Sequence, residues 1–549
     1  ALACGVAALF LLTSRHFWQQ PDIPRIALLP AGLLLLIWLQ YLLGMLPYAG
    51  QALLASGCLL WAALLVVLGR QLREELGLPA LAVTLAVFLL AGAEMGAMIG
   101  VLQHFGWRTM LDVVILPGPQ TGIVYGNLAQ SNHYANYTML GLVSLGLLAA
   151  HKRMPVWQTA LLAVPLLFAM VLSGSRSAGL YVLCLPFFSW LWQRRDISLR
   201  PLFHYSLALL AGFAVMSLLV NLPWLHGASG SMTAVGRLSG AGAESANIRL
   251  LIWREAWQIF LQHPLLGAGF GQFAWQHFLL GPTMRSIDLT GLYDNCHNIV
   301  LQIAAEMGLA GLLLLIGTLA LWLRQLARAT PSMYGWWGCA LLLTQGIHSM
   351  LEYPLWYAYF LGIAALLLGM LDTTAFRLSS GRAGAWAGSW VVAALLLAGA
   401  VTLAQAAMAW HKLERAAQIL RDTPDVRADL IEAARQPPLK PYADMLIANM
   451  QMVADADFAS QLALADRVMR FRPLGTVAFR QALLLALLNR PDEARIRMEQ
   501  AVWSWPDTYP QMQKELEFWA QKDPARCAAL LKFALQKYEE RQRAAIPAK

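Results

Sequence analysis

The sequence predicts an all-α protein that crosses a membrane many times. Of its 549 residues, 58% are hydrophobic and only 13% are charged, and the mean hydropathy is +0.53. Apolar runs recur along the chain, and many approach the ~20 residues that a helix needs to cross the hydrocarbon core of a bilayer. A composition this apolar excludes a chain that is soluble throughout.

We predict about twelve transmembrane helices from these runs. Some runs are short, and the helices there would need tilt or residues from the adjoining loops. By residue number, the predicted spans are 1–13, 26–46, 51–69, 79–102, 133–150, 156–172, 178–192, 202–221, 298–323, 335–350, 354–371 and 387–409.

Basic residues mark every second loop. Because Lys and Arg gather in cytoplasmic loops, this alternation supports the span count and places the basic loops in the cytoplasm. The net charge of +9 therefore reflects orientation and does not indicate nucleic-acid binding. With twelve spans the N-terminus lies outside, so we expect a further helix upstream of Ala1. The basic residues are Arg15, Arg25, Arg70, Arg73, Lys152, Arg153, Arg194, Arg195, Arg200, Arg324, Arg328, Arg377 and Arg382.

The longest outward loop, residues 222–297, has two parts. Its start is rich in Gly and Ser, at 227–231 and 240–242. A helical pattern with two Trp residues follows at Asn247–Phe260, and its mixture of aromatic, aliphatic and charged residues is typical of a helix at the membrane interface. Pro264 and the glycines after it end this helix.

The tail, residues 410–549, differs in composition from the rest and predicts a separate helical domain. Helical patterns alternate there with breaks at proline. The stretch Ala478–Pro506 resembles one helix pair of the tetratricopeptide kind, so we expect a domain of helical hairpins. The membrane domain would then cover residues 1–409.

A polar loop runs into an apolar helix at His297. Asn298, Gln302 and Glu306 follow at positions i, i+4 and i+8, so they share one helix face. Glu306 would lie roughly 13 Å into the helix, where a carboxylate should face protein or water and not lipid. The stripe suits either helix-to-helix hydrogen bonds or a functional site. We interpret Glu306 as internal support that holds His297 in place.

Further polar residues fall on the same predicted face of the membrane, near the ends of apolar runs. Arg176 and Arg249 suit a phosphate or pyrophosphate group, because the guanidinium fork matches phosphate oxygens and stays charged. His297 could take a proton from an incoming hydroxyl. Because no Asp-x-Asp metal signature occurs on this face, the pattern favours metal-independent transfer from a lipid-linked pyrophosphate.

Most of these candidates also have a structural interpretation. His297 could simply begin a helix beside an Asn cap, and Gln130 and Asn132 could cap the fifth span. Arg176 could be an interfacial anchor, and Tyr353 could belong to an aromatic belt.

The remaining polar residues of this face favour structural interpretations. Arg254 could pair with Glu255 or with solvent, and we interpret His133 and His348 as structural. The six cysteines show no paired spacing, so we expect neither a disulfide framework nor a zinc site.

Several of these motifs resemble the O-antigen ligase and polymerase superfamily. They are Ser175-Arg176-Ser177, the run Asn247–Gly269 and His297-Asn298 with Gln302, Glu306, Gly308 and Gly311. Within that superfamily the chain resembles the PglL-type bacterial protein O-oligosaccharyltransferases, through Gly126–His133, Glu352-Tyr353-Pro354-Leu355 and the helical tail. The ligase-like core covers about 120–370. Members often carry Pro or another residue where Ser131 stands, so Gln130 is the safer residue to carry over.

The resemblance implies a helical glycosyltransferase of the bacterial inner membrane, with its active site and tail in the periplasm. Such enzymes move a glycan from undecaprenyl pyrophosphate to a Ser or Thr hydroxyl of a pilin or another exported protein. By position, Arg176 and Arg249 would hold the pyrophosphate and stabilise it as leaving group. His297 would orient or deprotonate the acceptor, and Gln130 and Tyr353 would position donor or acceptor. No cofactor or metal is implied.

Other functions remain open from the sequence. The same chemistry could serve an O-antigen ligase that uses lipid A-core as acceptor, or an O-antigen polymerase. A transporter or flippase would favour internal repeats and polar residues at the bilayer midplane, whereas the polar residues here gather at one face. The clustered Arg and His residues argue against a non-catalytic scaffold.

Overall fold

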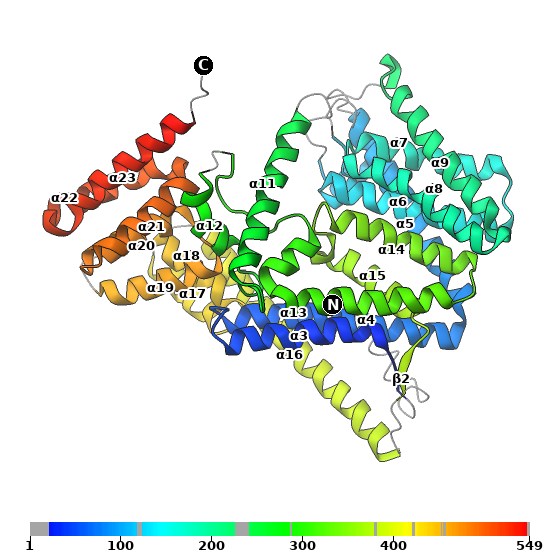
Figure 1. Ribbon diagram of the computed structural model, residues 1–549, viewed down its shortest axis with the longest axis horizontal. Helices are drawn as coiled ribbons and strands as arrows, with labels where there is room; N and C mark the ends of the chain where they lie inside the picture. The colour runs from blue at the N-terminus through cyan, green and yellow to red at the C-terminus, as the bar shows by residue number, and fades with distance from the viewer. Residues whose placement is uncertain are drawn as a thin grey trace. The chain divides into compact units, whose positions relative to one another are not determined.

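A computed structural model describes residues 21–117, 123–225, 241–285, 288–377, 382–419, 423–451, 453 and 457–545 (Figure 1). The predicted span 1–13, Arg15 and most of the Gly- and Ser-rich stretch lie outside these residues. The chain divides into two compact units. The first contains Trp61–Asn247 and Thr318–Ala383 with the chain up to Leu28, and the second contains Leu29–Leu60, Ile248–Gly317 and Gly384–Lys549.

The described chain is an all-α membrane protein. Six of its helices are long and apolar enough to cross a bilayer: Arg25–Leu42, Ala49–Leu76, Leu78–Phe105, Ile197–Leu219, Ile299–Arg328 and Trp386–Ile419. Shorter apolar helices include Val156–Leu172 and Ala358–Leu371. Each of the eleven predicted spans within the described residues coincides with a helix. The number of these helices that cross the membrane stays a prediction.

Helix α6 (Ser131–Lys152) is the centre of the first unit, because most of its side chains are buried. It packs against α5 (Leu78–Phe105), α7 (Val156–Leu172), α8 (Arg176–Arg195), α9 (Arg200–Leu219) and α14 (Met333–Ser349). Two indole N–H groups of α14 donate to serines of this bundle, Trp337 to Ser144 and Trp336 to Ser189. The start of α6, which follows the predicted site residue Gln130, is therefore held by a packed core.

One small sheet was not predicted. Strand β1 (Asp22–Pro24) pairs antiparallel with β2 (Ala375–Arg377). Arg70 in α4 (Ala49–Leu76) binds the Asp22 carboxylate at 2.8 Å and the Asp372 carbonyl at 2.7 Å. The remaining elements of this unit are α15 (Ala358–Leu371) and the short helices η1 (Arg25–Ala27), η2 (Met110–Val113), η3 (Gly126–Leu128), η4 (Ile197–Leu199), η5 (Pro223–Leu225) and η6 (Pro354–Trp356).

The second unit contains α3 (Leu28–Leu42), α11 (Ala241–Gln262), α12 (Phe273–Met284) and α13 (Ile299–Arg328). Helix α13 is broken at Gly308, where φ is 62° and ψ is −156°. The return segment 264–270 pairs with the break: the Leu309 N–H donates to the Pro264 carbonyl and the Gly269 N–H to the Glu306 carbonyl. The predicted span at 298–323 is thus two helical pieces with a connection between them.

The tail forms successive helices, which Figure 1 draws from yellow to red. They are α16 (Arg382–Ile419), α17 (Pro424–Ala434), α18 (Lys440–Met450), α19 (Phe458–Phe471), α20 (Gly475–Leu487), α21 (Pro491–Ser504), η7 (Pro506–Thr508), α22 (Tyr509–Lys522) and α23 (Pro524–Ala544). The predicted hairpin is the pair α20 and α21, which packs around Ala482 and Ala501. The tetratricopeptide-like character of the whole tail and its boundary at 410 stay predictions.

Helix α12, which the sequence analysis did not predict, joins the long loop to the tail. Phe278 of α12 lies in the core of the tail helices. The Arg497 guanidinium of α21 lies 4.8 Å from the Trp275 ring centroid of α12. The Gly291 N–H also donates to the Ser504 carbonyl at 2.8 Å. The tail therefore packs directly against the segment that leads into His297.

Candidate functional site

Three elements of the first unit meet at the side chain of Asn132. Its amide nitrogen donates to Glu352 Oε1 at 2.9 Å, and its amide oxygen accepts from the Ser175 hydroxyl at 2.7 Å. Asn132 lies two residues after Gln130, Ser175 directly precedes Arg176, and Glu352 directly precedes Tyr353. The unit thus brings together the elements that carry these three predicted site residues.

Gln130 is the N-cap of α6. Its side-chain oxygen accepts from the His133 N–H at 2.6 Å, which satisfies one of the free donors at the helix start. This contact is the capping alternative that the sequence left open. A role of Gln130 toward a substrate stays a prediction.

Tyr353 belongs to an aromatic cluster at the same end of the unit. Its ring stacks on Tyr357, with 6.1 Å between centroids. The rings of His133 and Tyr357 lie edge to face with 4.4 Å between their centroids, and the Tyr359 hydroxyl lies 3.0 Å from His133 Nδ1. Nearby, Asn136 and His348 are hydrogen-bonded in the core. His133 and His348 are buried, which agrees with their structural interpretation.

His297 sits at a turn of the second unit with φ of 56°, a left-handed conformation that non-glycine residues adopt rarely. Its backbone N–H donates to Asn295 Oδ1 at 2.7 Å. The Asn298 side chain caps α13, because its Oδ1 accepts from the backbone N–H groups of Val300 and Leu301. The cap fixes the point at which the loop becomes a helix. The His297 side chain is half-buried.

Gln302 and Glu306 are buried and bind backbone groups outside their own helix. Gln302 Oε1 accepts from the Cys296 N–H at 2.8 Å, and Glu306 Oε1 accepts from the Phe273 N–H at 3.2 Å. The first bond holds the residue before His297, and the second holds the start of α12. Since both acceptors serve the backbone, the stripe ties the His297 loop and α12 to α13.

Gln40 of α3 is a residue that the sequence analysis missed. Its side chain is completely buried. Its amide nitrogen donates to the carbonyls of Leu266 and Glu306, and its oxygen accepts from the Phe270 N–H. This one amide joins the return segment to the break in α13. A glutamine inside a predicted apolar span was the signal that could have identified it.

The helix that carries Arg249 contacts the His297 turn through another residue, Trp253. Trp253 lies one helical turn after Arg249 on α11, and its indole N–H donates to the Cys296 carbonyl at 2.9 Å. Arg249 is half-buried, whereas Arg254 is exposed. The second unit therefore holds together the elements that carry Arg249, His297, Asn298, Gln302 and Glu306.

Burial suppresses ionisation around this turn. It raises the pKa of the Cys296 thiol to about 12, so the thiol is neutral at physiological pH. Burial and then the charges of Glu255 and Asp288 raise the pKa of the Tyr293 phenol. Neither side chain is therefore a nucleophile at neutral pH, and the role of His297 in acid–base chemistry stays a prediction.

Glu255 and His277 form a buried pair that the sequence analysis also missed. His277 Nδ1 lies 2.8 Å from Glu255 Oε2, and the two side chains are 3% and 1% exposed. The pair joins α11 to α12. The buried side chains among residues 247–262 of α11 are Ile252, Glu255, Ala256 and Ile259. That helical spacing was the signal that Glu255 faces inward and not toward Arg254.

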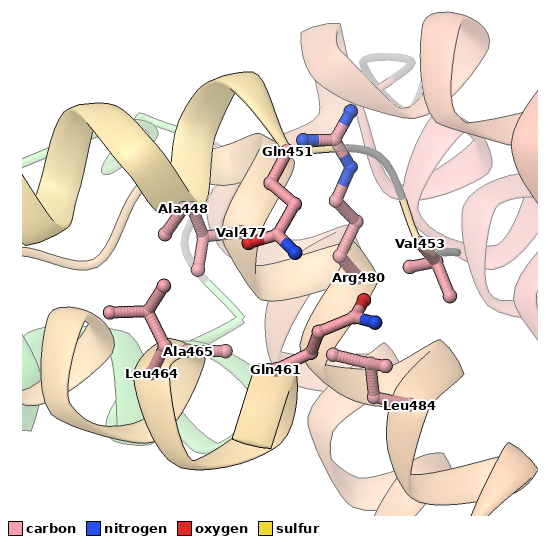
Figure 2. Close-up of a pocket in the computed structure, with 9 residues that line it drawn as sticks. All are labelled: Ala448, Gln451, Val453, Gln461, Leu464, Ala465, Val477, Arg480 and Leu484. Carbon is pink, nitrogen blue, oxygen red and sulfur yellow. The ribbon is translucent and has the colours of Figure 1, made fainter. Parts of the chain in front are cut away.

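The tail contains a pocket that none of the predicted site residues lines (Figure 2). About 280 Å³ of space there, part of it open solvent, is not filled by atoms. Its lining residues are Ala448, Gln451, Val453, Gln461, Leu464, Ala465, Val477, Arg480 and Leu484. Arg480 is held at its edge by Glu515 at 3.1 Å and by the Asn449 carbonyl at 2.8 Å. Since its arginine is already paired within the tail, the pocket suggests no reaction chemistry.

The described residues contain no group of three or more His, Cys, Asp or Glu side chains that could hold a metal ion. The described cysteines, 58, 184, 296, 339 and 527, are all free thiols. That the reaction needs no metal or cofactor stays a prediction, to be tested with a chelator.

Three families of known proteins match parts of the chain. The family described as protein glycosylation ligase matches residues 124–149, which include Gln130 and Asn132. The family described as O-antigen ligase matches residues 161–316, which include Arg176, Arg249 and His297. The C-terminal family of virulence-factor membrane-bound polymerases matches residues 336–517.

Two curated proteins of Acinetobacter baylyi are similar to the chain. A general O-oligosaccharyltransferase is 28% identical over 381 residues, which cover 66% of this chain and 64% of that protein. A ComP-specific O-oligosaccharyltransferase is 24% identical over 248 residues, which cover 45% of this chain and 43% of that protein. The matched region thus spans less than two thirds of either relative.

Proposed function

We propose that this chain, a relative of the PglL-type protein O-oligosaccharyltransferases of the O-antigen ligase superfamily, transfers an oligosaccharide to hydroxyl groups of proteins. The resemblance predicted from the sequence is confirmed by the relatives and by the families that match the chain. The donor would be a glycan on undecaprenyl pyrophosphate. The acceptor would be a Ser or Thr of a pilin or another periplasmic protein.

In the proposed reaction, the acceptor hydroxyl attacks the anomeric carbon of the glycan. The bond between that carbon and the pyrophosphate oxygen breaks, and undecaprenyl pyrophosphate leaves. His297 orients the hydroxyl and takes its proton. Arg176 and Arg249 bind the pyrophosphate and stabilise the charge that develops on it as it departs. Gln130 and Tyr353 position the donor or the acceptor.

One observation carries the roles of His297 and Arg249. The indole of Trp253 binds the Cys296 carbonyl, so the helix that carries Arg249 is joined to the turn that carries His297, although the sequence separates these two residues by 48 positions. A base and a phosphate-binding arginine on two joined elements suit transfer from a pyrophosphate, because such transfer needs both groups in fixed positions.

The proposed topology places the long loop and the tail in the periplasm, at the bacterial inner membrane. Contacts within the second unit support this side for both. The Tyr48 hydroxyl, in a turn that the sequence predicts to face outward, donates to Asp444 of the tail at 3.0 Å. Arg470 of the tail binds the Gly44 carbonyl at 2.9 Å. Segments in direct contact outside the bilayer share one side of the membrane.

Transfer by the purified protein tests this proposal. The protein in detergent or nanodiscs would be mixed with an undecaprenyl-pyrophosphate-linked oligosaccharide and a pilin, with and without EDTA. We expect glycosylated pilin by mass spectrometry in both samples. Loss of the product with EDTA, and its return with a divalent metal, would refute the metal-independent mechanism.

The second candidate function is transfer of the same glycan to lipid A-core or to another glycan. The families described as O-antigen ligase and as membrane-bound polymerase favour it, because their matches cover more of the chain than that of the glycosylation ligase. Lipid A-core and a second copy of the lipid-linked glycan therefore serve as parallel acceptors. A product with either, and none with any protein, would reject the protein acceptor.

A further inference from the structure

We propose that Asn132 is a positioning residue that sets the geometry of Gln130, Arg176 and Tyr353 together. The inference rests on the proposed function, because it names the part of the transfer site that these three residues share. Asn132 has no role among the predicted site residues. Its side chain makes one bond to each of the two other elements, and each partner directly precedes a predicted site residue.

The local structure leaves the Asn132 side chain available for this task. Gln130 already caps α6, so Asn132, in the first turn, is not needed as the cap. Its amide has one NH₂ donor group and one acceptor oxygen. The NH₂ group donates to Glu352, and the oxygen accepts from Ser175. An amide is thus suited to join a hydroxyl on one side to a carboxylate on the other.

Ser175 supports the inference independently. It occupies the N-cap position of α8, where a serine hydroxyl ordinarily accepts a stabilising hydrogen bond from a backbone N–H. Here its side chain makes no such cap bond. The buried hydroxyl instead donates to Asn132. Ser175 thus makes a tertiary hydrogen bond directly beside Arg176 in place of a local cap.

Glu352 is the second hydrogen-bond partner of the Asn132 side chain. It is 6% exposed, and a buried carboxylate is costly unless hydrogen bonds compensate for the lost water. The Asn132 amide provides such a bond, and the His348 carbonyl fixes the backbone by accepting from the Glu352 N–H at 2.8 Å. The side chain and the backbone N–H of Glu352 therefore both hold the turn that carries Tyr353.

A swap of donor and acceptor tests the bridge. In N132D, two carboxylates would face each other, and we expect transfer to fall about tenfold or more, because a bond to a charged group is lost. In E352Q, the Asn132 amide can still donate to the glutamine oxygen, so most of the activity should remain. In the double variant, the glutamine amide donates to the new aspartate, and activity should recover well above that of N132D.

Asn221→Asp is the matched control. Asn221 is exposed at the end of α9 in the same unit, and its side chain bonds only locally, to the Ser217 carbonyl. We expect transfer at the wild-type rate. Ser175→Ala is a milder test if N132D does not fold, because it removes only the hydrogen bond between Ser175 and Asn132. It should raise the KM for the lipid-linked donor several-fold with a smaller change in kcat.

The outcomes separate the inference from the proposed function. Three results would each overturn the positioning role while the wild-type enzyme remains active. N132D could transfer at the wild-type rate, the double variant could be as inactive as N132D, or Ser175→Ala could leave the KM for the donor unchanged. No transfer by the wild-type protein to any acceptor would reject the proposed function, and the inference with it. All rates are compared per mole of monodisperse protein.

Discussion

Glu255 and His277 show how single residues connect the long loop. Both side chains are almost completely buried, and they bind each other across α11 and α12. Helix α11 carries Arg249, and α12 packs on the tail. At the scale of the residue, this pair fixes α11, which carries the predicted phosphate-binding Arg249, to α12.

Removal of one partner should therefore destabilise the second unit. We expect Glu255→Ala to lower the free energy of unfolding by about 3 kcal/mol, because His277 is left buried without its partner. Glu255→Gln should cost less, since the amide oxygen can still accept from an Nδ1–H of His277. Thermal unfolding of the purified protein in detergent measures both changes.

The neighbouring Arg254→Ala is the control for this prediction. Arg254 is exposed on the same helix, and a surface substitution of this kind changes stability by roughly 0.5 kcal/mol or less. If Arg254→Ala lowers the free energy of unfolding as much as Glu255→Ala does, the pair of Glu255 and His277 makes no specific contribution to stability.

At the scale of the element, the break in α13 holds the His297 helix to the return segment. Gly308 has backbone angles that are essentially restricted to glycine. A Cβ there would lie 2.6 Å from the Gly267 nitrogen and 2.6 Å from the Leu265 carbonyl. Both contacts are to backbone atoms, which cannot move aside as a flexible side chain could.

Gly308→Ala should therefore displace the return segment, with strain of about 1–3 kcal/mol from the backbone angles alone. We expect reduced yield of folded protein and reduced transfer. Gly317→Ala is the matched control, because Gly317 lies in the same helix and a Cβ there meets nothing within 4 Å. Fluorescence-detected size-exclusion chromatography of both variants measures the yield. Equal yields and equal transfer would contradict the importance of the break.

The elements that sequence reasoning identified and those it missed differ in physical origin. Apolar runs and alternating basic loops depend on local composition, so every predicted span in the described part of the chain falls on a helix. The break at Gly308, the helix α12 and the role of Gln40 depend on contacts between segments far apart in the sequence. A pattern of period 3.6 carries no information about such contacts.

The candidate site divides in the same way. Residue chemistry and the family resemblance were enough to select His297, Arg176 and Arg249. The sequence could not identify Asn132 as the residue that joins three elements, because its partners are 43 and 220 positions away. Gln302 and Glu306 were predicted as one helix face, but their backbone partners at Cys296 and Phe273 were visible only in the fold.

At the scale of the whole molecule, the proposed function depends on topology. The basic loops should be cytoplasmic, and the long loop and the tail should be periplasmic. In a bacterial expression host, alkaline phosphatase fused after α23 or within the long loop should be active. The same reporter fused at the basic loop after Arg328 should be inactive. The opposite pattern would place the tail in the cytoplasm and separate it from any periplasmic acceptor.

The central claim is that His297 acts on the acceptor hydroxyl while two arginines hold the pyrophosphate. The most direct measurement is transfer to a pilin by purified His297→Ala, compared with the wild-type protein at equal amounts of folded enzyme. We predict that the variant keeps its thermal unfolding midpoint and its binding of the lipid-linked donor but loses at least about 100-fold in transfer rate. Transfer at the wild-type rate by His297→Ala would contradict the account.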